Sequence, residues 1–195
     1  MPEGFADRGA FNAALADHIC AHPSLVDAPA SHATREGKHS GELLIEPRGP
    51  VAGWEASLRR AIEAYRSALP EGSSHAFVAA MPERYRLTAW SVVLESQGHQ
   101  MPHIHPSAWM SGVYYVEIPE AVIASSEDTA GWIEFGQPPD HFHGRVQPEL
   151  KLVKPRRGML VLFPSYFYHR TIPFDAAGRR ISIAFDVLPY RGPQH

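Results

Sequence analysis

Three histidines in the second half of the chain stand at spacings that suit a metal site. His103 and His105 are two residues apart, so on a β-strand both imidazoles point to the same face. Pro102 and Pro106 flank the pair, which favours a strand end at the mouth of a barrel. His169 follows an apolar run and a short turn. We expect these three imidazoles to hold one divalent metal ion, for which iron(II) and zinc are both suitable.

A buried cation and a hydroxyl follow the third histidine. Arg180 lies eleven positions after His169, and Ser182 lies two positions further on. The run 180–185 alternates in the manner of a half-buried strand, where a charge needs a partner. Arg180 and Ser182 would share one face of that strand. We expect a small acid there, with one end on the metal and its far carboxylate in the fork of the Arg180 guanidinium.

Aromatic residues surround the proposed site in the sequence. Trp90 and Trp109 are candidates for the wall of a substrate pocket, and Trp109 follows closely after the histidine pair. Tyr114 and Tyr115 must point to opposite faces of their strand. One of the two therefore lies in the core and the other faces the cavity, and the sequence leaves this choice open.

The apolar pattern predicts two helices followed by many short strands. Apolar residues recur at helical spacing over 11–19 and 54–69, and a long polar connection with a short strand at 43–45 lies between them. Later runs rich in Val, Ile, Tyr, Phe and Trp are separated by Gly and Pro. The strands that we expect span 75–80, 86–95, 111–118, 131–135, 149–153, 159–163, 169–172 and 180–188.

Many short strands without crossover helices indicate an antiparallel sandwich or barrel. We therefore expect a mainly β protein, a jelly roll with two N-terminal helices packed on one sheet. The expected organisation is a single domain over 1–195, with a helical part at 1–72 and a β core at 73–190.

The amino-acid composition argues against nucleic acid and membranes as partners. The net charge is −3 and no Lys/Arg-rich run is present, so we expect no nucleic-acid partner. No apolar run approaches the roughly 20 residues of a membrane span. The chain has one cysteine, Cys20, and no visible signal peptide, and both features favour the cytoplasm.

These motifs together resemble the iron(II)- and 2-oxoglutarate-dependent oxygenases, which fold as a double-stranded β-helix. The segments HIHPSAWMSGVYYV, GWIEF, GMLVLFPS and RRISIAF are similar to a bacterial subfamily that sometimes follows tetratricopeptide repeats. The resemblance implies that His103 and His169 are metal ligands. It also implies that Arg180, Ser182 and Tyr115 bind the distal carboxylate of 2-oxoglutarate.

His105 departs from the pattern of that family, because Asp or Glu usually stands at this position. Three neutral imidazoles would leave the metal complex one unit more positive than two imidazoles and a carboxylate. Two ligand sets stay open: three histidines, or two histidines with a water in the third position.

The resemblance implies a dioxygenase that uses Fe(II), 2-oxoglutarate and O2, hydroxylates its substrate, and releases succinate and CO2. The substrate would be a small molecule, a peptide or a protein side chain. Two alternatives remain: a cupin-like three-His dioxygenase that does not use 2-oxoglutarate, and an inactive metal-binding or sensing module.

Overall fold

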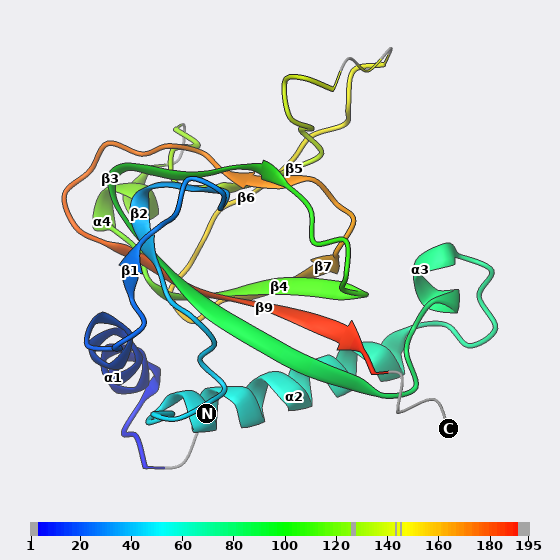
Figure 1. Cartoon of the computed structure of the whole chain (residues 1–195), viewed down its shortest axis with the longest axis horizontal. Helices are drawn as coiled ribbons and strands as arrows, with labels where there is room; N and C mark the ends of the chain where they lie inside the picture. The colour runs from blue at the N-terminus through cyan, green and yellow to red at the C-terminus, as the bar shows by residue number, and fades with distance from the viewer. Residues whose placement is uncertain (1–3, 126–127, 143, 145, 191–195) are drawn as a thin grey trace.

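The computed structural model describes residues 4–125, 128–142, 144 and 146–190, and a β-sheet dominates them (Figure 1). The elements, in chain order, are α1 (Arg8–Cys20), β1 (Val26–Asp27), β2 (Thr34–His39), α2 (Val51–Ala68), α3 (Ala76–Ala79), β3 (Tyr85–His103), β4 (Met110–Glu117), α4 (Glu120–Ala124), β5 (Ile133–Phe135), β6 (Lys151–Val153), β7 (Leu160–Pro164), β8 (His169–Thr171) and β9 (Arg180–Pro189). None of the helices in this described part is both long and apolar enough to cross a membrane.

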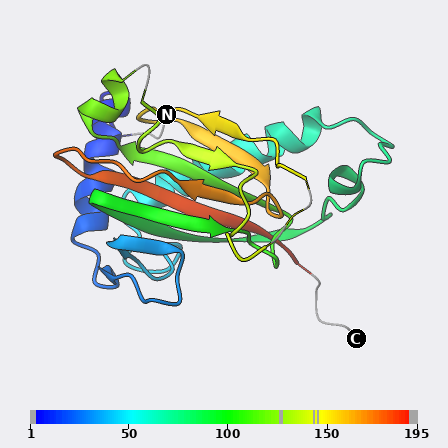
Figure 2. The same cartoon turned by 90° about the horizontal axis from the view of Figure 1, so that it is seen from above.

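The sheet is antiparallel throughout and curls over on itself. Its main strand order is β6-β5-β8-β3-β9-β4-β7, and β2 joins β3 along the side and carries β1. Figure 1 shows the two resulting layers, with β5, β6 and β8 above β4, β7 and β9. Viewed from above, the strands of the two layers cover one another (Figure 2). This is the jelly-roll arrangement that the alternating sequence pattern predicts.

The long strand β3 belongs to both layers. Its first part, from Tyr85 to Leu94, pairs with β9, whereas Gln100 and His103 pair with β8. The strand bends where Gln97 has a positive φ of 68° and Gly98 follows. A Cβ atom on Gly98 would lie 2.8 Å from two backbone carbonyl oxygens, so the bend requires glycine. This bend carries the end of β3 across to the upper layer.

Two apolar cores lie on the two sides of the lower layer. Between the layers, Val92, Val113, Phe135 and Phe163 are buried. On the outer side, α1 and α2 pack against the sheet, as the helical stripes predict, with Trp54 of α2 6.0 Å from Phe185 between ring centroids. The helices therefore cover the outer side of the lower layer, and its inner side faces the upper layer.

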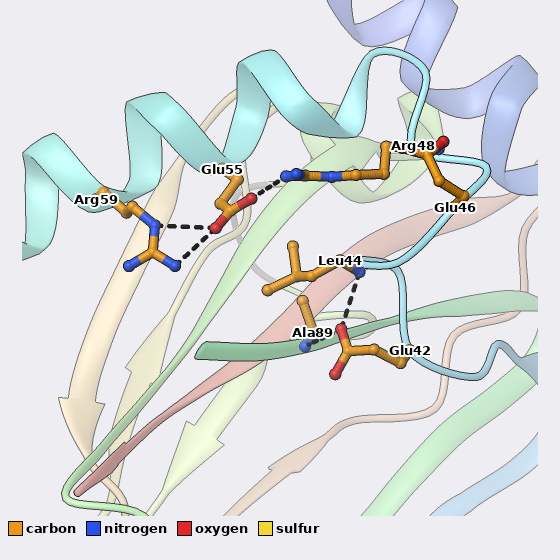
Figure 3. A network of polar contacts seen from close by, with 7 residues as sticks. All are labelled: Glu42, Leu44, Glu46, Arg48, Glu55, Arg59 and Ala89. Carbon is orange, nitrogen blue, oxygen red and sulfur yellow. Dashed lines mark hydrogen bonds and ion pairs between the residues drawn. The ribbon is translucent and has the colours of Figure 1, made fainter. Parts of the chain in front are cut away.

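The connection between β2 and α2 is held by carboxylates and contains no strand at 43–45 (Figure 3). Glu42 accepts hydrogen bonds from the backbone of Leu44 at 2.9 Å and of Ala89 at 3.0 Å. Glu55 of α2 binds both Arg48 and Arg59. Side-chain anchoring to β3 and α2 therefore replaces the expected strand.

Two other local expectations were wrong. The run 75–80, expected as a strand, forms the short helix α3, in which the His75 side chain accepts from the Phe77 backbone N–H. The predicted connection before α2 contains β1 and β2, because the edge of β3 offers hydrogen bonds to an extended chain. Neither outcome is visible in local apolar periodicity, since both depend on partners far away in the chain.

Candidate metal centre

Three imidazoles converge where β3 ends and β8 begins. His103, the last residue of β3, pairs directly with His169, the first residue of β8. His105 follows two residues later and is tied to the turn after β7 by a hydrogen bond from its backbone N–H to the Ser165 carbonyl. One ring nitrogen from each histidine lies within 4.8 Å of the other two. This grouping was predicted from the sequence, and the same distance limit holds for His105 as for the other two histidines.

The other ring nitrogen of each histidine already has a hydrogen-bond acceptor. Nδ1 of His103 lies 2.7 Å from the Met101 carbonyl oxygen, and Nδ1 of His169 lies 3.0 Å from the Phe167 carbonyl oxygen. A carbonyl only accepts, so Nδ1 carries the proton in both rings. Each Nε2 atom therefore keeps a lone pair for a metal, which is the arrangement that orients histidine ligands in metalloproteins.

Burial keeps two of these rings neutral. It lowers the pKa of His103 from 6.5 to about 4, against the opposing effect of the Met101 carbonyl. Burial also lowers the pKa of His169 well below 6.5, and the neighbouring His103 adds to this. Neutral imidazole is the form that binds a metal, so the fold holds both rings ready for ligation.

The third ring, His105, has a carboxylate behind it. Its Nδ1 lies 2.8 Å from Oδ1 of Asp186 on β9, and the indole of Trp90 stacks on the ring at a centroid distance of 5.6 Å and an angle of 19°. Asp186 was not predicted from the sequence. The signal was available, because Asp186 lies on the same face of β9 as Arg180 and Ser182 by the alternation of the strand.

A second polar group lies deeper between the layers. Arg180 is only 1% exposed, and its guanidinium lies over the ring of the buried Tyr115, 5.0 Å from the ring centroid. Its Nε donates to the Gly131 carbonyl at 3.1 Å. Among the described residues, however, Nη1 of Arg180 and Oη of Tyr115 have no hydrogen-bond partner. Two unpartnered donors in a buried place suit a carboxylate.

The structure places the serine and the two tyrosines that were candidates for binding the cosubstrate. Ser182 is buried and opposite Tyr115 in the register of β4 and β9. Tyr114 faces the other way, and its hydroxyl donates to Asn12 of α1 at 2.7 Å. The open choice between the two tyrosines is thus settled in geometry: Tyr115 lies between the layers.

Of the two candidate tryptophans, one lines the cavity beside the histidines and the other does not. Trp90 lines a cavity of about 400 Å³ beside the histidines. Trp109 is buried elsewhere, stacked on Phe77 at 4.7 Å, with its indole N–H donating to the Phe77 carbonyl. It does not line the cavity beside the histidines, because α3, which was expected to be a strand, covers it.

Comparison with known proteins assigns the family. Residues 88–186 match the model of the family described as "Putative 2OG-Fe(II) oxygenase", and this segment is half of the chain. The chain belongs to this family. It is therefore an oxidoreductase whose cofactors are iron(II) and 2-oxoglutarate, and the family match speaks against the cupin-like alternative without 2-oxoglutarate.

Solved structures agree with this fold. A prolyl-4-hydroxylase from Pseudomonas putida has a TM-score of 0.63 at 15% identity, covering 94% of this chain and 88% of that one. HygX from Streptomyces hygroscopicus, solved with nickel and 2-oxoglutarate, has a TM-score of 0.62 at 14% identity, covering 97% and 81%. No curated protein matches the chain significantly in sequence. These similarities confirm the double-stranded β-helix.

The buried histidines give a pH dependence to the stability of the metal-free protein. The folded pKa of His103 lies below its unfolded value of about 6.5, so the unfolded chain binds more protons below that pH. We predict that the free energy of unfolding falls as the pH drops from about 6.5 towards 4, as measured by urea unfolding after chelation.

The variant His103→Asn isolates this contribution. Its unfolding free energy should fall less steeply over the same pH range, whereas His141→Asn, in an exposed loop, should keep the wild-type slope. An unchanged slope in His103→Asn would contradict the assignment of a buried neutral ring.

Proposed function

We propose that the protein is an iron(II)- and 2-oxoglutarate-dependent dioxygenase that hydroxylates its substrate, with His103, His105 and His169 as the metal ligands. The observation that carries this proposal is that one ring nitrogen of each histidine lies within 4.8 Å of the other two. All three Nδ1 atoms have a hydrogen-bond acceptor, so each ring keeps its Nε2 lone pair for a metal. Three imidazoles with an open side suit a ferrous ion that must also bind a cosubstrate.

Arg180 is the proposed partner of the distal carboxylate of 2-oxoglutarate. Burial lowers the pKa of its guanidinium, which means that the charged form is held at a cost that a ligand carboxylate would offset. Nη1 of Arg180 and Oη of Tyr115 are the free donors for that carboxylate. Ser182 adds a hydroxyl on the same face of β9, opposite Tyr115.

Iron held by the three histidines would supply the oxidative chemistry of this family, in which the substrate, O2 and 2-oxoglutarate yield the hydroxylated substrate, succinate and CO2. The side chains of this protein set the geometry for it. The histidines fix the ion, Arg180 and Tyr115 orient the cosubstrate, and apolar residues such as Phe135 and Phe163 beside His169 keep bulk water away. We assign no residue as a general acid or base.

The cavity next to the histidines is the proposed substrate site. His39, Trp90 and His105 form a stacked row along it, with centroid distances of 6.0 and 5.6 Å. No Lys or Arg is among the described residues that line it, and Asp186 is. This lining favours an uncharged or cationic group, such as a ring or chain lying on the indole, over an anionic one.

A peptide is one form of substrate that fits this description. The structurally similar proteins include prolyl hydroxylases, one of them solved with a peptide fragment of hypoxia inducible factor. We propose a small molecule or a peptide side chain without negative charge as the substrate class.

Succinate formation tests the proposed reaction. The iron(II)-loaded protein with ascorbate, O2 and 2-oxoglutarate should release succinate, slowly alone and faster when a suitable substrate from a panel of neutral and cationic peptides is added. Failure to form succinate, together with failure to bind 2-oxoglutarate anaerobically, would contradict the proposal.

Arg180→Met tests the cosubstrate site. Loss of the charged hydrogen bonds, worth about 1.5–3 kcal/mol, should weaken 2-oxoglutarate binding about 10- to 100-fold in anaerobic titrations while metal affinity is kept.

Arg179→Met is the matched control, because this neighbouring arginine is exposed and pairs with Glu117. It should bind 2-oxoglutarate as the wild type does. Equal affinities in the two variants would show that Arg180 is not the carboxylate partner.

A further inference from the structure

We propose that Asp186 is a positioning residue that gives the metal centre, through His105, the negative charge that its ligand set lacks. This inference rests on the proposed function, since it requires His105 to be a metal ligand. It goes beyond that function, because it explains how a histidine can stand where the family usually has a carboxylate.

The contact between the two side chains is close and well supported. Nδ1 of His105 lies 2.8 Å from Oδ1 of Asp186, and the hydroxyl of Ser111 donates to the same oxygen at 2.5 Å. Ser111 and Asp186 are opposite one another in the register of β4 and β9. The carboxylate is therefore held in place from two sides, and Nδ1 of His105 must be the protonated nitrogen.

Among the described residues, no Lys or Arg side chain pairs with Asp186. It is 9% exposed, and within the described part of the chain the one ion-pair partner it reaches is His105. A buried carboxylate whose donors are a hydroxyl and an imidazole is costly to fold unless a positive charge lies close by. A divalent ion on the far side of the His105 ring would supply that charge.

The three histidines are not equivalent in this respect. His103 and His169 donate from Nδ1 to backbone carbonyl oxygens, whereas His105 donates to a carboxylate. A carboxylate acceptor makes the opposite ring nitrogen a stronger donor to a metal and fixes the ring orientation. Stacking on Trp90 also keeps the His105 ring nearly parallel to the indole. The additional contacts with Asp186 and Trp90 are thus made by His105, the one proposed ligand that departs from the family pattern.

The three histidines together with Asp186 carry the same net charge as the usual ligand set of the family. Two neutral imidazoles with one carboxylate ligand carry one negative charge, and so do three imidazoles with Asp186 behind one of them. It follows that the site needs a carboxylate at position 105 or at position 186, and that carboxylates at both positions would repel each other.

A double-mutant cycle on metal affinity tests whether the site needs one carboxylate, at position 105 or at position 186. The variants are Asp186→Asn, His105→Asp and the double variant, and the measurement is the affinity of the chelator-treated protein for Co(II) and for anaerobic Fe(II). Asp186→Asn keeps the shape and an acceptor oxygen but removes the charge, and it should weaken binding roughly 10- to 100-fold. His105→Asp should also weaken binding, and the double variant should recover most of that loss.

Glu134→Gln is the control for removing a buried acid. Glu134 is 5% exposed and pairs with Arg170, so its loss should leave metal affinity within about 3-fold if the charge effect belongs to Asp186 alone. A further readout is ¹⁵N NMR of the zinc-loaded protein, in which the His105 ring should show a protonated Nδ1 in the wild type.

The outcomes separate this inference from the proposed function. Wild-type affinity in Asp186→Asn, or losses that simply add in the double variant, would overturn the role of Asp186 while leaving the metal site intact. Absence of metal binding by the wild type itself would instead overturn the metal site. If Asp186→Asn unfolds, ¹⁵N NMR of the zinc-loaded wild type still decides the question, because a His105 ring without a proton on Nδ1 would overturn the role of Asp186.

Discussion

The candidate site depends on the passage of one strand between two layers of the sheet. β3 pairs with β9 in the lower layer and with β8 in the upper layer, and only this crossing brings His103 opposite His169. The crossing requires Gly98, since a Cβ atom there would collide with backbone carbonyl oxygens. Backbone geometry therefore assembles two of the three histidines of the candidate metal centre, and loop packing adds His105, which Ser165 and Asp186 hold.

Polar groups between the layers are kept where packing alone would exclude them. Arg180 and Tyr115 lie fully buried with free donors, and Asp186 lies near the mouth with a histidine and a serine as its partners. Buried charges and unpartnered donors of this kind cost stability, and we propose that bound ligands offset that cost. A cation near Asp186 and an anion near Arg180 are what a divalent metal with a dicarboxylic acid would provide. The positions of the buried acid and the buried base thus match the metal and the distal carboxylate of the proposed metal–2-oxoglutarate complex.

Much of this arrangement could be predicted from alternation in the sequence. The strands from β4 onward fall close to the expected ranges, and the inner face of β9 places Arg180 and Ser182 together, because period-2 patterning is a local property. β3 was expected over 86–95 but continues to His103, since its far end pairs with β8. The exceptions all depend on distant partners. α3 forms where a strand was expected and covers Trp109, and β2 forms because β3 offers it an edge. Alternation places Asp186 on the inner face of β9, but its bond to His105 joins residues 81 apart, and local patterning does not show that bond.

The position of His105 tests the account most directly. A crystal structure of the protein with manganese(II) and 2-oxoglutarate, grown without oxygen, would show the ligands themselves. We predict that Nε2 atoms of His103, His105 and His169 lie about 2.0–2.3 Å from the ion, with Asp186 still bonded to Nδ1 of His105. A water in the third position, with the His105 ring turned away from the ion, would contradict the account.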